Sequence, residues 1–172
     1  AFEGLMGGPL FEAVLVVLAK GGFYTVRTSR VWTGPAWPDP SDPPYYNAVV
    51  EGSWRDGPQE LLALLLETEL SFGRQRSVRN APRTLDLDLL DHEGGRGRFE
   101  PDLVVPHTRL SGRPFILGPL AEAAPDWRHP ETGRSALELF EASENKEQYC
   151  CVAEKLLKAP ESQRILEPLP IS

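Results

Sequence analysis

Two carboxylates placed two residues apart give the clearest chemical signal in this sequence. Asp86 and Asp88 lie among leucines in the segment RTLDLDLLDH, residues 83–92. In a β-strand successive side chains alternate between faces, so we expect a third strand here, with both acids on one face and the leucines toward the core. Like charges this close repel unless a cation neutralises them. The pattern predicts a Mg²⁺ site, because Mg²⁺ takes one or two carboxylates together with substrate phosphates. The alternative is a solvated strand face.

Four arginines precede the acids within ten residues: Arg74, Arg76, Arg79 and Arg83. Serine, asparagine and proline are interleaved with them, so we expect a loop. Guanidinium groups bind phosphate oxygens bidentately and stabilise charge in phosphoryl transfer. Acids beside such a loop indicate chemistry on a nucleoside triphosphate, although salt bridges from the loop to Glu67 and Glu69 are the simpler alternative. The sequence contains neither a P-loop motif nor a glycine-rich kinase loop.

The elements that must position these residues follow an α+β order. Hydrophobic spacing and the breaks at glycine and proline predict helices at 9–20, 56–73, 113–125 and 135–142, strands at 23–32, 45–54 and 83–92, a loop at 33–44 and a turn or hairpin at 92–100. This order predicts a ferredoxin-like βαββαβ sandwich, an antiparallel sheet with helices packed on it, whose opening strand is absent from this sequence. The segment QYCCVAE, residues 148–154, has the β-propensity to fill that central position.

Size and composition exclude several classes of protein. A chain of 172 residues predicts one domain with a substantial core, and its net charge of −7 argues against a general nucleic-acid binder. Adjacent Cys150 and Cys151 cannot join distant segments, so no secreted disulfide framework is expected. The apolar run at residues 10–20 is too short to span a bilayer and contains Glu12. We expect a cytoplasmic protein with no nucleic-acid or membrane partner.

The stretch RNAPRTLDLDLL, residues 79–90, closely resembles the signature of the 6-hydroxymethyl-7,8-dihydropterin pyrophosphokinase family of folate biosynthesis. Further similar segments follow the family's order and spacing: TGPAW, PPYYNAVV, ETELSFGRQR, VVPHTRLSGRPFILGPL and APDW. The resemblance covers residues 9–140, which predicts a pyrophosphokinase domain at 1–142 and a C-terminal extension or linker of unknown role at 143–172.

The resemblance implies an ATP-dependent diphosphokinase. The family transfers pyrophosphate from ATP to the hydroxymethyl group of the pterin and releases AMP, by in-line displacement with two Mg²⁺ ions and closure of an arginine loop. The positions of Asp86 and Asp88 then bind the two Mg²⁺ ions, and Arg74 and Arg83 act beside them in catalysis. The positions implied in ATP binding are Glu69, Arg76, Arg79, His107 and Arg113.

A flat pterin needs a slot with aromatic walls and a few fixed polar groups. By resemblance the slot comprises Pro35, Ala36, Trp37, Tyr45, Asn47 and Phe115, where Phe115 stacks on one face of the ring and Asn47 pairs with its amide edge. Other interpretations stay open: core packing for Tyr45, a structural role for His107, and a solvent-facing helix position for Glu69.

The sequence also departs from the family pattern. The arginine loop is one residue shorter than a common form, Asn80 stands where a tryptophan often lies, and Thr108 replaces an aromatic residue. Two other functions compete with pyrophosphate transfer. The protein would then be a non-catalytic ferredoxin-like module that binds nucleotide, or a metal-dependent phosphohydrolase. The expected partners are ATP and the hydroxymethyl pterin, bound by a monomer that is alone or joined to another folate enzyme.

Overall fold

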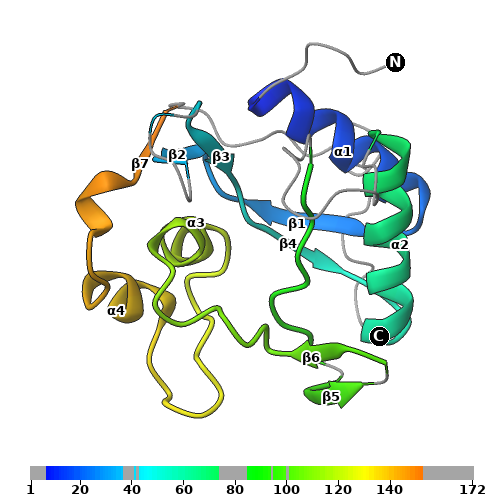
Figure 1. The fold of residues 1–172 in the computed structure, drawn as a ribbon. Coiled ribbons are helices and arrows are strands. Elements are labelled where there is room, and N and C mark those ends of the chain that lie inside the picture. The colour runs from blue at the N-terminus through cyan, green and yellow to red at the C-terminus, as the bar shows by residue number, and fades with distance from the viewer. Residues whose placement is uncertain are drawn as a thin grey trace, which may run out of the picture.

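The computed structural model describes residues 7–36, 41, 43–73, 85–93, 95–99 and 101–152. Short antiparallel sheets with helices packed on them form an α+β fold of the ferredoxin-like kind, which confirms the predicted class (Figure 1). Within these ranges, no helix combines the length and apolar character that crossing a membrane requires.

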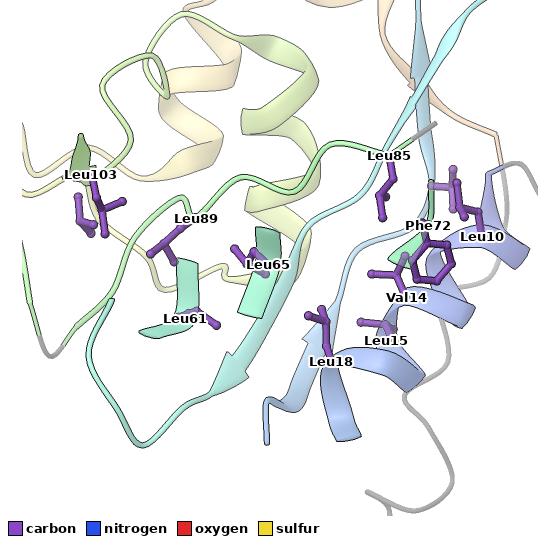
Figure 2. Close-up of a cluster of buried hydrophobic side chains, with 12 residues drawn as sticks. Leu10, Val14, Leu15, Leu18, Leu61, Leu65, Phe72, Leu85, Leu89 and Leu103 are labelled. Carbon is purple, nitrogen blue, oxygen red and sulfur yellow. The ribbon is translucent and has the colours of Figure 1, made fainter. Parts of the chain in front are cut away.

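Helices α1 (Gly8–Lys20) and α2 (Pro58–Ser71) confirm the first two predicted helices. Each carries a proline in its first turn, where the missing N–H leaves no intrahelical bond unmade. Leucines and valines at helical spacing turn one face of each helix into a shared core with Phe72 (Figure 2).

The two strands predicted at 23–32 and 45–54 each divide into two. Strand β1 (Tyr24–Thr28) pairs antiparallel with β4 (Val50–Ser53), and β2 (Trp32–Gly34) pairs with β3 (Tyr45–Asn47). Between the pairs, Ser29 N donates to Val49 O at 2.9 Å, while Val49 N donates to the Ser29 hydroxyl at 2.9 Å. A side chain therefore replaces a backbone acceptor at this point, which interrupts the ladder.

Helices α3 (Pro114–Ala123) and α4 (Ala136–Glu141) enclose a second core with Val49, apart from the core of α1 and α2. Ser135 and Glu138 form a capping box that starts α4, in agreement with the short helix predicted there. The strand pair β1–β4 lies between α1 and α2 on one side and α3 on the other (Figure 1).

The predicted strand at 83–92 is wrong as an element. Among the described residues, none forms a ladder with 85–92, and the hairpin that follows consists of β5 (Gly97–Phe99) and β6 (Leu103–Val105). The backbone finds other partners: Leu87 N donates to the Glu69 carboxylate, and Leu90 O accepts from His107 N. The segment therefore keeps the alternation of a strand without belonging to a sheet.

Residues of the expected C-terminal extension return to the sheet. After the 3₁₀ helix η1 (Lys146–Gln148), strand β7 (Cys150–Cys151) pairs antiparallel with β2, giving the order β3–β2–β7 (Figure 1). The suggestion that this segment fills the central opening position is wrong, because β7 lies at the edge of its sheet, beside β2.

Candidate active site

The acid segment presents its carboxylates outward. Asp86 and Asp88 are exposed, whereas Leu85 and Leu89 are only 4% and 8% exposed and point into the core of α1 and α2 (Figure 2). The leucines anchor the segment by burial, so both acids lie on the side away from the core. This arrangement confirms the predicted alternation, although the segment is no strand.

Glu69 of α2 fastens the backbone between the two acids. Its side chain is 1% exposed, and Oε1 accepts a hydrogen bond from Leu87 N at 2.7 Å. A bond from a backbone N–H to a carboxylate is short and strong, and inside the protein it is not weakened by competing water. The solvent-facing interpretation of Glu69 is therefore wrong, while its predicted contact with ATP stays a prediction.

His107 and Asp88 line the same hollow. This hollow is open, has a volume of about 270 Å³ and is also lined by Leu87 and Arg109. His107 N donates to Leu90 O at 2.8 Å, which ties the histidine to the end of the acid segment. Nδ1 of His107 accepts from Arg109 N at 3.2 Å, so the neutral ring carries its proton on Nε2. That N–H is a donor suited to a phosphate oxygen.

Asp91 anchors the other end of the acid segment. Its carboxylate accepts from Arg96 Nε at 3.0 Å, from a terminal Arg96 nitrogen at 2.6 Å and from Trp127 Nε1 at 2.8 Å. Burial raises the pKa of Asp91, but the hydrogen bonds from Arg96 and Trp127 outweigh it, and the pKa lies below its ordinary value. The segment that carries Asp86 and Asp88 is thus fixed by polar contacts at its middle and its end.

The residues expected to bind the pterin lie on β2, β3 and the start of α3. In the register of β2 and β3, Tyr45 pairs with Gly34 and Asn47 pairs with Trp32. Residues two apart on a strand share a face, so Tyr45 and Asn47 point the same way, as the alternation predicts. Directly paired residues of an antiparallel ladder also share a face, so Trp32 lies on the face of Asn47. A Cβ on Gly118 of α3 would lie 2.7 Å from the Trp32 ring, so this face of the sheet is the one turned toward α3.

Phe115 follows Pro114, the first residue of α3. The Arg113 guanidinium carbon lies 5.5 Å from the centre of the Phe115 ring, within range of a cation–π contact. Tyr149 lies on the same ring, with centroids 5.9 Å apart and planes tilted by 40°. The side chain of Tyr45 is 53% exposed, which leaves aromatic surface available to a ligand and disfavours the core-packing interpretation.

The remaining predicted site residues divide into two sets. Pro35 is half-buried and Ala36 is buried at the end of β2, whereas Trp37, Arg74, Arg76, Arg79 and Arg83 lie outside the described residues, so their roles stay predictions. Sequence reasoning missed Tyr149 altogether, because its segment matches no part of the family pattern. Nothing in the local sequence distinguishes this tyrosine from one in a linker.

The donor set at the acid segment suits a hard cation. Across the described ranges, no group of three or more His, Cys, Asp and Glu side chains could hold a metal ion alone. Two exposed carboxylates fit Mg²⁺, which usually completes its coordination with water and substrate phosphates. Asp86 and Asp88 would therefore hold Mg²⁺ together with a phosphate ligand rather than as a closed protein site.

Comparison with known proteins shows which proteins this chain is similar to. Residues 10–125 match the model of the family described as 7,8-dihydro-6-hydroxymethylpterin-pyrophosphokinase (HPPK). A 2-amino-4-hydroxy-6-hydroxymethyldihydropteridine pyrophosphokinase of Synechocystis sp. is 44% identical over 147 residues, which cover 82% of this chain and 74% of that protein. The enzyme of the same name from Pseudomonas aeruginosa is 43% identical, over 60% of this chain and 63% of its own length. A mitochondrial folate synthesis bifunctional protein of Arabidopsis thaliana is 36% identical over 65% of this chain, which spans only 20% of that protein.

Proposed function

The chain belongs to the 7,8-dihydro-6-hydroxymethylpterin-pyrophosphokinase family, and we propose that it transfers pyrophosphate from ATP to the hydroxymethyl group of 6-hydroxymethyl-7,8-dihydropterin, releasing AMP. The hydroxymethyl oxygen attacks the β-phosphorus of ATP and loses its proton. The bond between that phosphorus and the oxygen bridging to the α-phosphate breaks, and AMP leaves. Such transfers require little covalent work from the protein, so positioning and electrostatics must supply the rate.

The observation that carries this proposal is the exposed acid pair on an anchored segment. Asp86 and Asp88 face away from the core, while Glu69 holds the peptide between them at 2.7 Å. A fixed backbone holds the two carboxylates near where a ligand needs them, so less freedom is lost when the ligand binds. Two Mg²⁺ ions held there with the ATP phosphates would neutralise charge and align the attacking and leaving oxygens.

His107 and the arginines complete the phosphate site in this proposal. The Nε2 proton of His107 donates to a phosphate oxygen beside Asp88, because both residues line one hollow. Arg74 and Arg83 bind the transferred phosphates as the substrates are enclosed, and Arg113 contacts ATP near the start of α3. Guanidinium groups suit this role since their charge is permanent and their donors match phosphate oxygens in pairs.

The pterin binds against Phe115, with Tyr45 and Asn47 on the facing strand. Support comes from the shared face of Tyr45 and Asn47 and from the contact of α3 with β2 and β3. Aromatic faces stack on a planar ring, and the Asn47 amide can both donate to and accept from its amide edge. The backbone of Pro35 and Ala36, directly after β2, supplies further contacts.

The experiment mixes the protein with ATP, Mg²⁺ and the hydroxymethyl pterin and identifies the nucleotide product. AMP in amounts equal to the pterin diphosphate supports the proposal. ADP as the product would indicate an ordinary kinase, and free phosphate without pterin consumption would indicate a phosphohydrolase. Nucleotide binding without turnover would indicate the non-catalytic module.

Two aspects of the cellular setting stay predictions. A monomer, alone or joined to another folate enzyme, is consistent with relatives of both kinds, since the Arabidopsis protein is named as bifunctional and the Synechocystis enzyme is not. The expected cytoplasmic location also stays a prediction, and one plant relative is named as mitochondrial.

A further inference from the structure

Tyr149 reaches the residues that the proposed function assigns to pterin binding. Its ring lies 5.9 Å from that of Phe115, centre to centre. It also lies directly over Gly34, where an added Cβ would come within 2.1 Å of Tyr149 Cδ1. One tyrosine therefore bridges the start of α3 and the end of β2, two elements on which the pterin residues are placed.

Backbone pairing fixes Tyr149 in this position. In the register of β2 and β7, Thr33 pairs with Cys150 and Trp32 with Cys151, and Val152 N donates to Val31 O at 2.9 Å. On the other side, Tyr149 N donates to Lys146 O at 3.1 Å and closes η1. Tyr149 thus lies between η1 and β7, the short strand beside β2 (Figure 1).

Tyr149 shares the face of the sheet that carries Tyr45. Gly34 and Tyr45 are paired residues, so a side chain on Gly34 would point to the same face as Tyr45. Tyr149 fills the space that such a side chain would take. Glycine at position 34 is therefore a requirement of the close approach between the Tyr149 ring and the β2 backbone.

We propose that Tyr149 is a positioning residue for the pterin, an inference that rests on the proposed function. Phe115 is contacted by the Arg113 guanidinium and by the Tyr149 ring. Together these neighbours restrict the orientation of Phe115, so its stacking face is set before the pterin arrives. A side chain ordered in advance costs less affinity on binding than one that must be immobilised. The segment after residue 142 is then part of the substrate site.

Substitution of Tyr149 tests this role. Tyr149→Ala should raise the dissociation constant and the KM of the hydroxymethyl pterin about threefold to tenfold, the range expected from loss of one aromatic contact. The KM of ATP and kcat should stay within about twofold, because the acid pair, Glu69 and His107 lie on other elements than Tyr149. Tyr149→Phe should behave as the unsubstituted protein, since the contacts involve the ring. Gln148→Ala, at the exposed neighbouring position, is the matched control.

Gly34→Ala gives an independent test. The added methyl group should displace the Tyr149 ring and weaken pterin binding by a similar factor. In a Tyr149→Ala background the same substitution should have little further effect, because the ring whose atoms lie nearest to the added methyl group is then gone. Additive losses in the double variant would contradict the inference.

Several results would overturn the inference. Unchanged pterin affinity in Tyr149→Ala would contradict the positioning role. Tighter pterin binding in this variant would mean that the ring obstructs the site. Equal losses of affinity for pterin and ATP would indicate general structural damage. If the unsubstituted protein releases AMP and only the Tyr149 result fails, the proposed function stands and this inference falls. If the unsubstituted protein binds no pterin in direct titration, both fall.

Discussion

From the hydrogen bond between Leu87 N and the Glu69 carboxylate we predict that Glu69→Ala destabilises the fold. The substitution removes a carboxylate acceptor at 2.7 Å and leaves a peptide N–H without this partner beneath the acid pair. A hydrogen bond to a charged group contributes about 1.5–3 kcal/mol, and an unsatisfied buried donor costs about 1–3 kcal/mol, two overlapping measures of the same loss. With the cavity left by a side chain that is 1% exposed, we expect the free energy of unfolding to fall by about 3 kcal/mol.

Turnover should fall together with stability. Without the anchor the segment shifts, and displacement of catalytic groups by about 1 Å can reduce a rate about 100-fold. Glu69→Gln keeps a neutral acceptor of similar shape, so it should retain most of the turnover and lose about 1 kcal/mol of stability. Glu67→Ala, on an exposed position of the same helix, should change neither quantity.

Urea unfolding and AMP release, measured on the same preparations, check this prediction. A loss of stability below about 0.5 kcal/mol with normal turnover would refute the reasoning, because the bond would then hold nothing in place. Lost turnover with unchanged stability would indicate that the Glu69 carboxylate acts on the nucleotide itself, as the family resemblance implies, rather than through Leu87.

Three further predictions concern the acids and the arginine loop. Asp88→Ala should abolish pyrophosphate transfer and shift Tm by less than about 2 °C, since the side chain is exposed; retained activity at saturating Mg²⁺ would contradict the metal role. Arg83→Ala should lower kcat far more than it weakens ATP binding, and equal losses in the two constants would reduce the residue to a binding contact. Because the pKa of Asp91 is lowered in the folded protein, its contacts stabilise the fold at pH values above 3.8, the ordinary pKa of the group. This contribution is lost as the pH falls through the folded-state pKa. Acid unfolding of Asp91→Asn should therefore depend less steeply on pH than that of the unsubstituted protein, and an identical profile would exclude the contribution of the contacts with Arg96 and Trp127.

The helices were predictable because their signals are local. Apolar spacing, first-turn prolines and the Ser135–Glu138 capping box all depend on residues within a few positions of each other, and the observed helices match the predicted ones closely. The two long strands were predicted at the right places, but not their interruption at Ser29. The hydroxyl that causes it bonds to Val49, twenty residues away, and alternation along one strand carries no information about that contact.

The acid segment shows the same limit of prediction from a local pattern. Alternation at 85–89 correctly predicted which side chains are buried, because burial depends on which face meets the core. Membership of a sheet depends on a neighbouring ladder, and here the Glu69 side chain and His107 N bond to the backbone instead. A pattern within one segment indicates its faces, while its hydrogen-bond partners are properties of the tertiary structure.

The candidate site residues were selected where the family pattern runs and not beyond it, and their roles stay predictions. Asp86 and Asp88 were selected from their spacing and then from the matching motif, and Tyr45, Asn47 and Phe115 from the motif alone. Two-residue spacing correctly predicted that Asp86 and Asp88 share a face, although their segment is no strand, and that Tyr45 and Asn47 share one on β3. Tyr149 lies in a segment with no matching pattern, and its contact with Phe115 depends on β7 pairing with β2.

The most direct test of the proposed metal site is a crystal structure of the protein with Mn²⁺ in place of Mg²⁺ and a non-hydrolysable ATP analogue. Anomalous scattering locates the cations without ambiguity. We expect Mn²⁺ bound by Asp86 and Asp88 and by the phosphates, with the Glu69 to Leu87 bond intact beneath them. Carboxylates turned away from the nucleotide, with no cation between them and the phosphates, would contradict the proposed metal site.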